Sequence, residues 1–250
     1  MIRILTLNTW KCDGDYAARL KVMRRQLQDT APDIICLQEV FVDDAGEYDT
    51  GRDLANALGM RLIQFPARRK PRQINGKAIM STSGLAILTN YSIERTTTRP
   101  LPSFDDDDRW LMLAELSWTS GRLSVLNTHL THLDSQLGMR KRLDQLNDVL
   151  NAAQQSKTHL TALAGDFNLA KDHQALRKVS RCTGHLHCEH QIKTTLIGAS
   201  ARPIDHIFAF DTSASWRISK YYTSMNLTDP LEGVFASDHC AVVMELSRQP

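Results

Sequence analysis

Short apolar runs recur along the whole chain, separated by polar and turn-forming residues. Many are rich in Ile, Val and Leu and bounded by Gly, Asp, Asn or Pro, so they predict β-strands. The predicted strands are Ile2–Leu7, Ile34–Val40, Leu85–Thr89, Leu111–Trp118, Leu123–Thr128, Leu160–Ala164, Ile204–Phe210 and Ala241–Leu246. Three other segments place apolar residues at helical spacing, which predicts helices at Ala17–Asp29, Gly51–Leu58 and Gln136–Gln155.

The order of these elements predicts the fold class. The runs at 85–89, 111–118 and 123–128 follow one another without a helix between them, so strand and helix do not simply alternate. We therefore expect an α/β protein of the α+β kind, with sheets of mixed strand direction and helices outside. No linker or internal repeat divides the sequence, and we expect residues 1–250 to form a single domain.

Composition changes this picture little. With 42% hydrophobic and 23% charged residues the chain can bury a large core, and a formal charge of +2 neither requires nor excludes a nucleic-acid partner. The five cysteines are dispersed, and neither a signal peptide nor a transmembrane stretch is recognisable. We expect a cytoplasmic protein in a reducing compartment, and a monomer.

Two charged segments predict surface loops. Ala67–Gly76 is basic and contains Pro and Gly, and Phe104–Arg109 contains four successive aspartates. A solvated loop is the simpler interpretation of each. The functional alternative is a contact with a phosphate backbone for the basic segment and a weak cation site for the acidic one.

Polar side chains gather where the predicted strands end. One such residue is usually a cap or a turn residue, but a set of eight needs a shared explanation. The set is Asn8, Glu39, His129, Asp166, Asn168, Asp205, Asp238 and His239; of these, Asp205 lies inside the PIDHIF run, and Asp238 and His239 precede the last run.

Phosphoryl transfer explains the carboxylates in this set. A hard divalent cation neutralises the charge that develops during attack on phosphorus, and Mg²⁺ prefers oxygen ligands. Glu39 and Asp238 are therefore candidate Mg²⁺ ligands. Asp166 and Asn168 are two residues apart, so in an extended segment they would point the same way and could hold one water molecule.

The histidine near the end of the chain suits proton transfer. His239 could donate to a phosphoryl oxygen or move a proton, because imidazole titrates near neutral pH. A buried Asp205 could fix the tautomer and orientation of that ring, as the third member of a catalytic triad does.

Six short motifs follow one another along the chain: TLNTW, LQEV, NTHL, GDFN, PIDHIF and SDH. In this order they resemble the successive motifs of the endonuclease/exonuclease/phosphatase superfamily, from residue 4 to about residue 246. The resemblance implies a four-layered α/β sandwich, in which two mixed β-sheets pack face to face with helices outside. It also implies a metal-dependent hydrolase of phosphoester bonds.

The resemblance assigns the metal-binding residues by motif. Glu39 would be the main Mg²⁺ ligand, Asn8 would help to orient it, and Asp238 would bind or approach a metal. Mn²⁺ is an alternative ion.

The same motifs assign the catalytic residues. Asp166, with Asn168 beside it, would activate or position the attacking water, and His129 would hold the phosphate. His239 would pair with Asp205, and either Asp166 or His239 could be the base. We favour Asp166.

Several positions bear on the substrate. Val40 and Phe41 follow LQE, and His129 stands where abasic-site endonucleases usually carry Tyr, so an abasic-site endonuclease is disfavoured. LQEV with a THL-type histidine is more similar to the sphingomyelinase, tyrosyl-DNA phosphodiesterase and deadenylase branches. Arg109 matches a family arginine that precedes a strand, and it would contact the substrate or form a surface salt bridge.

These observations lead to one expected function and three alternatives. We expect a Mg²⁺-dependent phosphodiester hydrolase acting on nucleic acid, as a nuclease or a DNA-end phosphodiesterase. A phospholipid or sphingomyelin phosphodiesterase and a phosphatase of small phosphorylated substrates are the alternatives. A remote one is a non-catalytic binding protein on the same fold, which would have lost Glu39, Asp166 or His239.

The stretch Cys182–His190 contains two Cys and three His, which suits Zn²⁺. Its spacing matches no zinc finger, and we favour a polar excursion between two elements.

Overall fold

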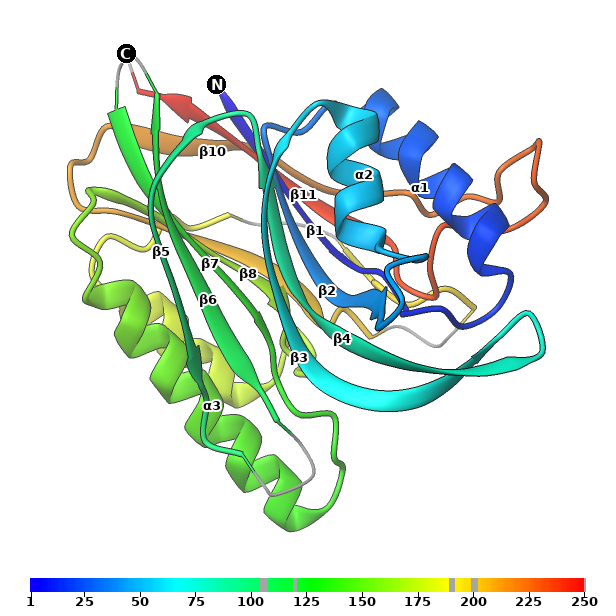
Figure 1. Cartoon of the computed structure of the whole chain (residues 1–250). Helices are drawn as coiled ribbons and strands as arrows, with labels where there is room; N and C mark the ends of the chain where they lie inside the picture. The colour runs from blue at the N-terminus through cyan, green and yellow to red at the C-terminus, as the bar shows by residue number, and fades with distance from the viewer. Residues whose placement is uncertain (104–107, 119–120, 189–191, 199–201, 250) are drawn as a thin grey trace.

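The chain folds into two β-sheets flanked by helices, as a computed structural model shows (Figure 1). The structure describes residues 1–103, 108–118, 121–188, 192–198 and 202–249. The strands are β1 (Ile2–Asn8), β2 (Ile34–Asp43), β3 (Arg61–Ile74), β4 (Lys77–Thr89), β5 (Ser92–Pro100), β6 (Trp110–Trp118), β7 (Gly121–His129), β8 (Leu160–Asp166), β9 (Asp205–Asp211), β10 (Trp216–Ser224) and β11 (Ala241–Arg248). The helices are α1 (Tyr16–Thr30), α2 (Thr50–Leu58), α3 (Gln136–Gln154) and the 3₁₀ helix η1 (Gln174–Arg181).

Both sheets have mixed strand direction. The first has the order β10-β11-β1-β2-β4-β3, and the second has the order β5-β6-β7-β8-β9. In each sheet two neighbouring strands run parallel, β1 beside β2 and β7 beside β8, and the other pairs are antiparallel. A helix joins each parallel pair, giving the units β1-α1-β2 and β7-α3-β8.

Side-chain packing arranges these elements in four layers. Ile4 and Ile87 of the first sheet belong to one buried cluster with Val125 and Ala162 of the second, so the two sheets pack face to face. On the outer face of the first sheet, Leu5 and Leu37 are buried with residues of α1 and α2. On the outer face of the second, Leu126 and Leu163 are buried with residues of α3 and η1. Because both faces of these strands are buried, the strands read as nearly continuous apolar runs. The predicted sandwich is confirmed.

The predicted basic loop over Ala67–Gly76 is wrong. Most of it belongs to β3, which pairs with β4 from Arg61↔Thr89 to Ile74↔Lys77. Asn75 and Gly76 form the turn, with φ of 50° and 74°, and Asn-Gly is the preferred pair for such a tight hairpin. Pro71 is tolerated because β3 is an edge strand of its sheet.

The remaining differences from the predicted elements are strands and the 3₁₀ helix η1, which was not expected. β5 and β10 were not expected, and β4 begins at Lys77 rather than Leu85. The three predicted helices form within two residues of their expected ends. Residues 104–107 of the predicted acidic loop lie outside the described residues. No described helix combines the length and the apolar character needed to cross a membrane.

Candidate active site

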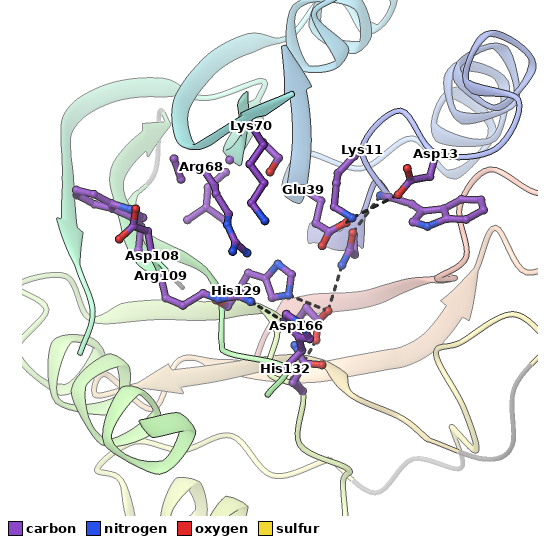
Figure 2. Close-up of a pocket in the computed structure, with 18 of the residues that line it drawn as sticks. Lys11, Asp13, Glu39, Arg68, Lys70, Asp108, Arg109, His129, His132 and Asp166 are labelled. Carbon is purple, nitrogen blue, oxygen red and sulfur yellow. Dashed lines mark hydrogen bonds and ion pairs between the residues drawn. The ribbon is translucent and has the colours of Figure 1, made fainter. Parts of the chain in front are cut away.

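The predicted polar residues meet in one cleft at an end of the sandwich. Asn8, His129 and Asp166 are the last residues of β1, β7 and β8, and His129 is in register with Asp166 on the parallel pair. The cleft has a volume of 1070 Å³ and is lined, among others, by Asn8, Glu39, Arg109, His129, Asp166, Asn168, Asp238 and His239 (Figure 2). Asp205, the first residue of β9, is buried behind His239 rather than lining the cleft.

The sequence predicted that Glu39 ends its strand, and this prediction is wrong. β2 continues to Asp43, and a register shift between Leu37 and Val40 places Glu39 in a bulge with φ of 55°. A side chain in this left-handed region costs on the order of 1 kcal/mol, so the surroundings must hold it there. Gln38 helps to do so, since its Nε2 donates to Asn127 Oδ1 of the facing sheet at 2.8 Å. The bulge leaves Glu39 on the wall of the cleft while its neighbours stay buried.

Asp166 is the centre of the hydrogen-bonding network. Its Oδ2 accepts from Asn8 Nδ2 at 3.1 Å and lies 3.4 Å from His129 Nε2 and 4.0 Å from His239 Nε2. Its Oδ1 accepts from the backbone N–H of Asn168 at 2.9 Å. Burial, reinforced by the nearby Asp205 carboxylate, raises the pKa of Asp166 to about 7. The carboxylate is thus held in place and titrates near neutral pH.

The two histidines around Asp166 differ in charge. Burial alone would lower the pKa of His239, but the carboxylates of Asp205, Asp166 and Asp238 outweigh it and raise the pKa to about 10. His239 Nδ1 lies 2.8 Å from Asp205 Oδ2, as the sequence predicted. Burial and the Arg109 charge hold the pKa of His129 well below its usual range. At neutral pH His239 is therefore an imidazolium and His129 a neutral imidazole.

The expected geometry of Asn168 is wrong. Its φ is 49°, so the segment after Asp166 is not extended and the two side chains do not point the same way. Asn168 Nδ2 instead donates to the carbonyl of Leu130 at 3.0 Å, which ties the end of β8 to the loop after β7. Both residues still line the cleft.

The donor set fits a hard divalent cation. The carboxylates of Glu39, Asp166 and Asp238 all line the cleft, and oxygen donors of this kind suit Mg²⁺ or Mn²⁺. The pKa of Asp238 is raised, first by burial and also by the negative charge of Glu39, so these two carboxylates interact. Asp166, Asp205 and His239 offer ligand atoms within 4.8 Å of one another. A cation bound near Glu39 and Asp238 would relieve the repulsion between these two carboxylates.

A lysine already supplies positive charge beside Glu39. Lys11 Nζ lies 3.1 Å from Glu39 Oε2 and 3.4 Å from Asp13 Oδ2. Burial lowers the pKa of Lys11, but these two carboxylates outweigh it and raise the pKa overall. The Glu39 carboxylate is therefore in a position where a cation is stabilised.

The sequence and the fold decide the family. The model of the Endonuclease/Exonuclease/phosphatase family matches the chain over residues 5–239. The chain belongs to this family. Members of the endonuclease/exonuclease/phosphatase family hydrolyse phosphoester bonds and use divalent metals, so this protein is a hydrolase of phosphoester bonds. No curated protein shows a significant sequence match to the chain.

Solved structures share the fold at low sequence identity. An endonuclease/exonuclease/phosphatase from Beutenbergia cavernae DSM 12333 has a TM-score of 0.75 and 21% identity, with 99% of this chain and 71% of that chain covered. The catalytic domain of human Nocturnin, with bound sulfate, has a TM-score of 0.75 and 18% identity over 99% of this chain and 93% of that chain. D. rerio TDP2 in complex with a single-strand DNA product has a TM-score of 0.74 and 16% identity over 98% of each chain.

Arg109 of this endonuclease/exonuclease/phosphatase family member lines the cleft. It is 8% exposed, and its Nη2 lies 2.9 Å from His132 Nδ1. His132, in the loop after β7, also lines the cleft. The pair brings a guanidinium and an imidazole close to His129 (Figure 2).

Two further residues near the site were missed by the sequence reasoning. Lys11 directly follows the TLNTW motif, and a cation next to a motif that ends a predicted strand is the signal that could have found it. Arg19 is buried, and its guanidinium donates to backbone carbonyls of the turn after β1 and of Ala236. The acceptors are the carbonyls of Thr9, Trp10, Lys11, Asp13 and Ala236.

The alternative zinc site receives no support from the described residues. Of the stretch Cys182–His190, residues 182–188 are described, and none of them belongs to a described cluster of metal-ligating side chains. His190 lies outside the described residues.

Proposed function

We propose that this hydrolase is a Mg²⁺-dependent phosphodiesterase that acts on nucleic acid. The observation that carries the proposal is the position of Asp166. Its carboxylate accepts a hydrogen bond from Asn8, lies near His129 and His239, and lines a cleft whose wall carries Glu39 and several basic side chains. This arrangement offers a base, a charged proton donor and metal ligands around one point.

Glu39 and Asp238 would hold the Mg²⁺, and Mn²⁺ would accept the same oxygen ligands. When bound, the ion would neutralise charge on the phosphoryl oxygens and on the leaving group. Asn8 contributes indirectly, since its Nδ2 is committed to Asp166 and its Oδ1 accepts from the backbone N–H of Trp10 at 3.0 Å. We therefore assign Asn8 to the orientation of Asp166.

Asp166 is the proposed base. A general base works best when its pKa is near the working pH, and burial brings this carboxylate to about 7. The bonds from Asn8 and from the Asn168 N–H fix both of its oxygens, so the carboxylate meets an attacking water in one orientation. In this scheme Asp166 accepts a proton of the water as the water attacks phosphorus and the bond from phosphorus to the leaving oxygen breaks. The leaving oxygen then takes a proton from solvent.

The two histidines are proposed to bind the phosphate. His239, held as an imidazolium by Asp205, would donate from Nε2 to a phosphoryl oxygen and stabilise the charge that develops there. His129, as a neutral imidazole, would donate a second hydrogen bond without adding charge. Arg109 would contact the same group from the other side of His129.

Three features favour nucleic acid among phosphodiester substrates. Lys11, Arg68, Lys70, Arg72 and Arg109 all line the cleft, which is more positive charge than one phosphodiester anion requires. The same cleft also exposes apolar surface at Leu133, Leu137 and Trp110. One structural neighbour, D. rerio TDP2, was solved with a single-strand DNA product.

The test is a panel of substrates with the wild-type protein in Mg²⁺, Mn²⁺ or EDTA. It includes labelled single- and double-stranded DNA, RNA, sphingomyelin and an inositol polyphosphate. We expect metal-dependent cleavage of a nucleic acid and its loss in Asp166→Asn. Cleavage of sphingomyelin or of the inositol phosphate, with every nucleic acid left intact, would replace the proposed substrate class.

A further inference from the structure

Three cations of β3 alternate with residues that face away from the cleft. Arg68, Lys70 and Arg72 line the cleft, as residues two apart on a strand share one face. Arg69, between the first two, faces the other way, and its Nη2 lies 2.5 Å from Asp44 Oδ2. Arg68, Lys70 and Arg72 thus form a row of positive charge on one face of β3. Arg69 carries the same charge on the opposite face.

This row is held in place by its partner strand. Arg72 donates from Nη1 to Ser81 Oγ at 2.9 Å and from Nη2 to Ser83 Oγ at 2.7 Å, both on β4. At the far end of the hairpin Ile74 is buried, and it packs in a cluster with Cys12 of the turn after β1. The strand backbone therefore carries these charges without the freedom of a loop, which lowers the entropic cost of binding an anion.

The row lines part of the cleft away from the residues proposed for catalysis. Figure 2 shows Arg68 and Lys70 pointing into the pocket from the β3 side, toward the region between Glu39 and His129. Arg68, Lys70 and Arg72 share one face of β3 within a single cleft, so an anion bound there would meet several positive charges at once. The residues proposed for catalysis account for one phosphate group and leave this row unused.

The spacing of the row and the apolar residues of the same cleft indicate the kind of anion. Side chains two apart on a strand repeat every 6.6 Å or so, roughly the separation of neighbouring phosphates along a nucleic-acid strand. Leu133 and Leu137 line the cleft with the row, and Leu137 is 54% exposed at the start of α3. A polynucleotide has both a repeating phosphate and an apolar base to place in such a cleft.

We propose that Arg68, Lys70 and Arg72 form a subsite for the phosphate groups neighbouring the scissile one, supplied by a polynucleotide strand. The subsite deepens the proposed function and rests on it. A second phosphate ester on a small molecule has the same chemistry as the next phosphate of a strand, and the experiment separates these two sources.

The experiment compares three substrates in Mg²⁺: the p-nitrophenyl ester of thymidine 5′-phosphate, the same ester with a 3′-phosphate, and the same ester extended by three nucleotides. The quantity measured is kcat/KM for each extended substrate divided by that for the simple ester. In the wild type we expect this ratio to rise with the 3′-phosphate and again with the added nucleotides. In Arg68→Ala and Lys70→Ala it should fall about tenfold, the effect of one lost charge-assisted contact.

Arg69→Ala is the matched control, because it removes the same charge from the other face of the same strand. We expect its ratio to equal that of the wild type. The salt dependence gives a second readout: log kcat/KM for the extended substrate should fall less steeply with log salt, by about 0.7 per removed contact, in Arg68→Ala and Lys70→Ala only.

The outcomes separate the subsite from the proposed function. Failure of the wild type to hydrolyse any of the three esters would contradict the proposed function. Hydrolysis of the simple ester with a ratio near one, or an equal loss in Arg69→Ala, would overturn the subsite alone. A kcat/KM ratio that rises with the 3′-phosphate but not further with the added nucleotides would rule out a polynucleotide as the occupant of the subsite.

Discussion

His239 Nδ1 lies 2.8 Å from Asp205 Oδ2, and both side chains are buried, with 6% and 2% of their surfaces exposed. The other Asp205 oxygen, Oδ1, is buried without a hydrogen-bond partner among the described residues. The pair therefore owes its stability to the imidazolium–carboxylate contact, and removing either partner leaves a buried charge uncompensated.

This contact predicts a pH-dependent loss of stability in Asp205→Asn. The folded-state pKa of His239 is raised to about 10 from 6.5. The stability that the charged ring contributes to the folded state is therefore fully present below pH 6.5 and is lost as the pH rises through 10. The free energy of unfolding, measured in EDTA, should fall by roughly 3 kcal/mol in the variant near pH 6.5, and the deficit should shrink toward pH 10. Asp172→Asn, at an exposed carboxylate, is the control. A deficit that stays constant from pH 6.5 to 10 would contradict the charged pair.

Lys11→Met is predicted to tighten metal binding. The Lys11 ammonium contacts Glu39 at 3.1 Å and competes with a cation for the same carboxylate. Its removal should lower the dissociation constant of Mg²⁺ about fivefold, equivalent to about 1 kcal/mol for an ion pair that is partly exposed.

Titration calorimetry without substrate measures this constant directly. Lys21→Met, at an exposed lysine paired with Glu232, should leave it unchanged. Weaker binding in Lys11→Met than in wild type would show that Lys11 supports the metal site and does not compete with it.

Arg19→Lys is predicted to impair the positioning of the active-site residues more than the binding of substrate. One guanidinium joins the turn after β1 to Ala236, two residues before Asp238, and a lysine cannot reproduce its forked donors. We expect a loss of about 2 kcal/mol in the free energy of unfolding and a kcat about tenfold lower, with KM within about twofold of wild type. Arg25→Lys changes a guanidinium on the same helix that pairs with Asp229. An equal fall of kcat in Arg25→Lys would exclude a specific positioning role for Arg19.

Glu39→Gln is predicted to lose metal affinity while keeping the fold. The amide has the shape of the carboxylate and suits the same bulge, but it lacks the charge that attracts the ion. We expect an increase of at least about tenfold in the Mg²⁺ concentration that gives half-maximal activity. Circular dichroism and the melting temperature should match wild type within a few degrees. An unchanged metal requirement would remove Glu39 from the proposed ligand set.

Much of the core could be predicted from the sequence, because strands buried on both faces leave uninterrupted apolar runs. β8 and β11 were found in this way. β3 was not, since an edge strand with one face toward a polar cleft is rich in Arg and contains Pro71. Its hairpin signal was the Asn75-Gly76 pair, which lies inside the segment interpreted as a loop.

The candidate site was predicted from the residues that end strands, and its local geometry could not be predicted in this way. Asn8, His129 and Asp166 end their strands as expected, because these polar motif residues directly follow apolar runs in the sequence. The bulge at Glu39 and the left-handed Asn168 depend on contacts with distant segments, such as Gln38 with Asn127. Lys11 reaches Glu39 through its side chain, and Arg19 donates to backbone carbonyls of a turn whose shape no local pattern specifies.

The most direct test of the account is cleavage of a fluorescently labelled oligonucleotide by wild type, His239→Ala and Asp166→Asn at pH 7.5, with Mg²⁺ or EDTA. The account predicts Mg²⁺-dependent cutting by wild type, at least about a hundredfold less by either variant, and none in EDTA. Equal cutting by wild type and Asp166→Asn, or cutting by wild type that persists in EDTA, would contradict a metal-dependent hydrolysis centred on Asp166.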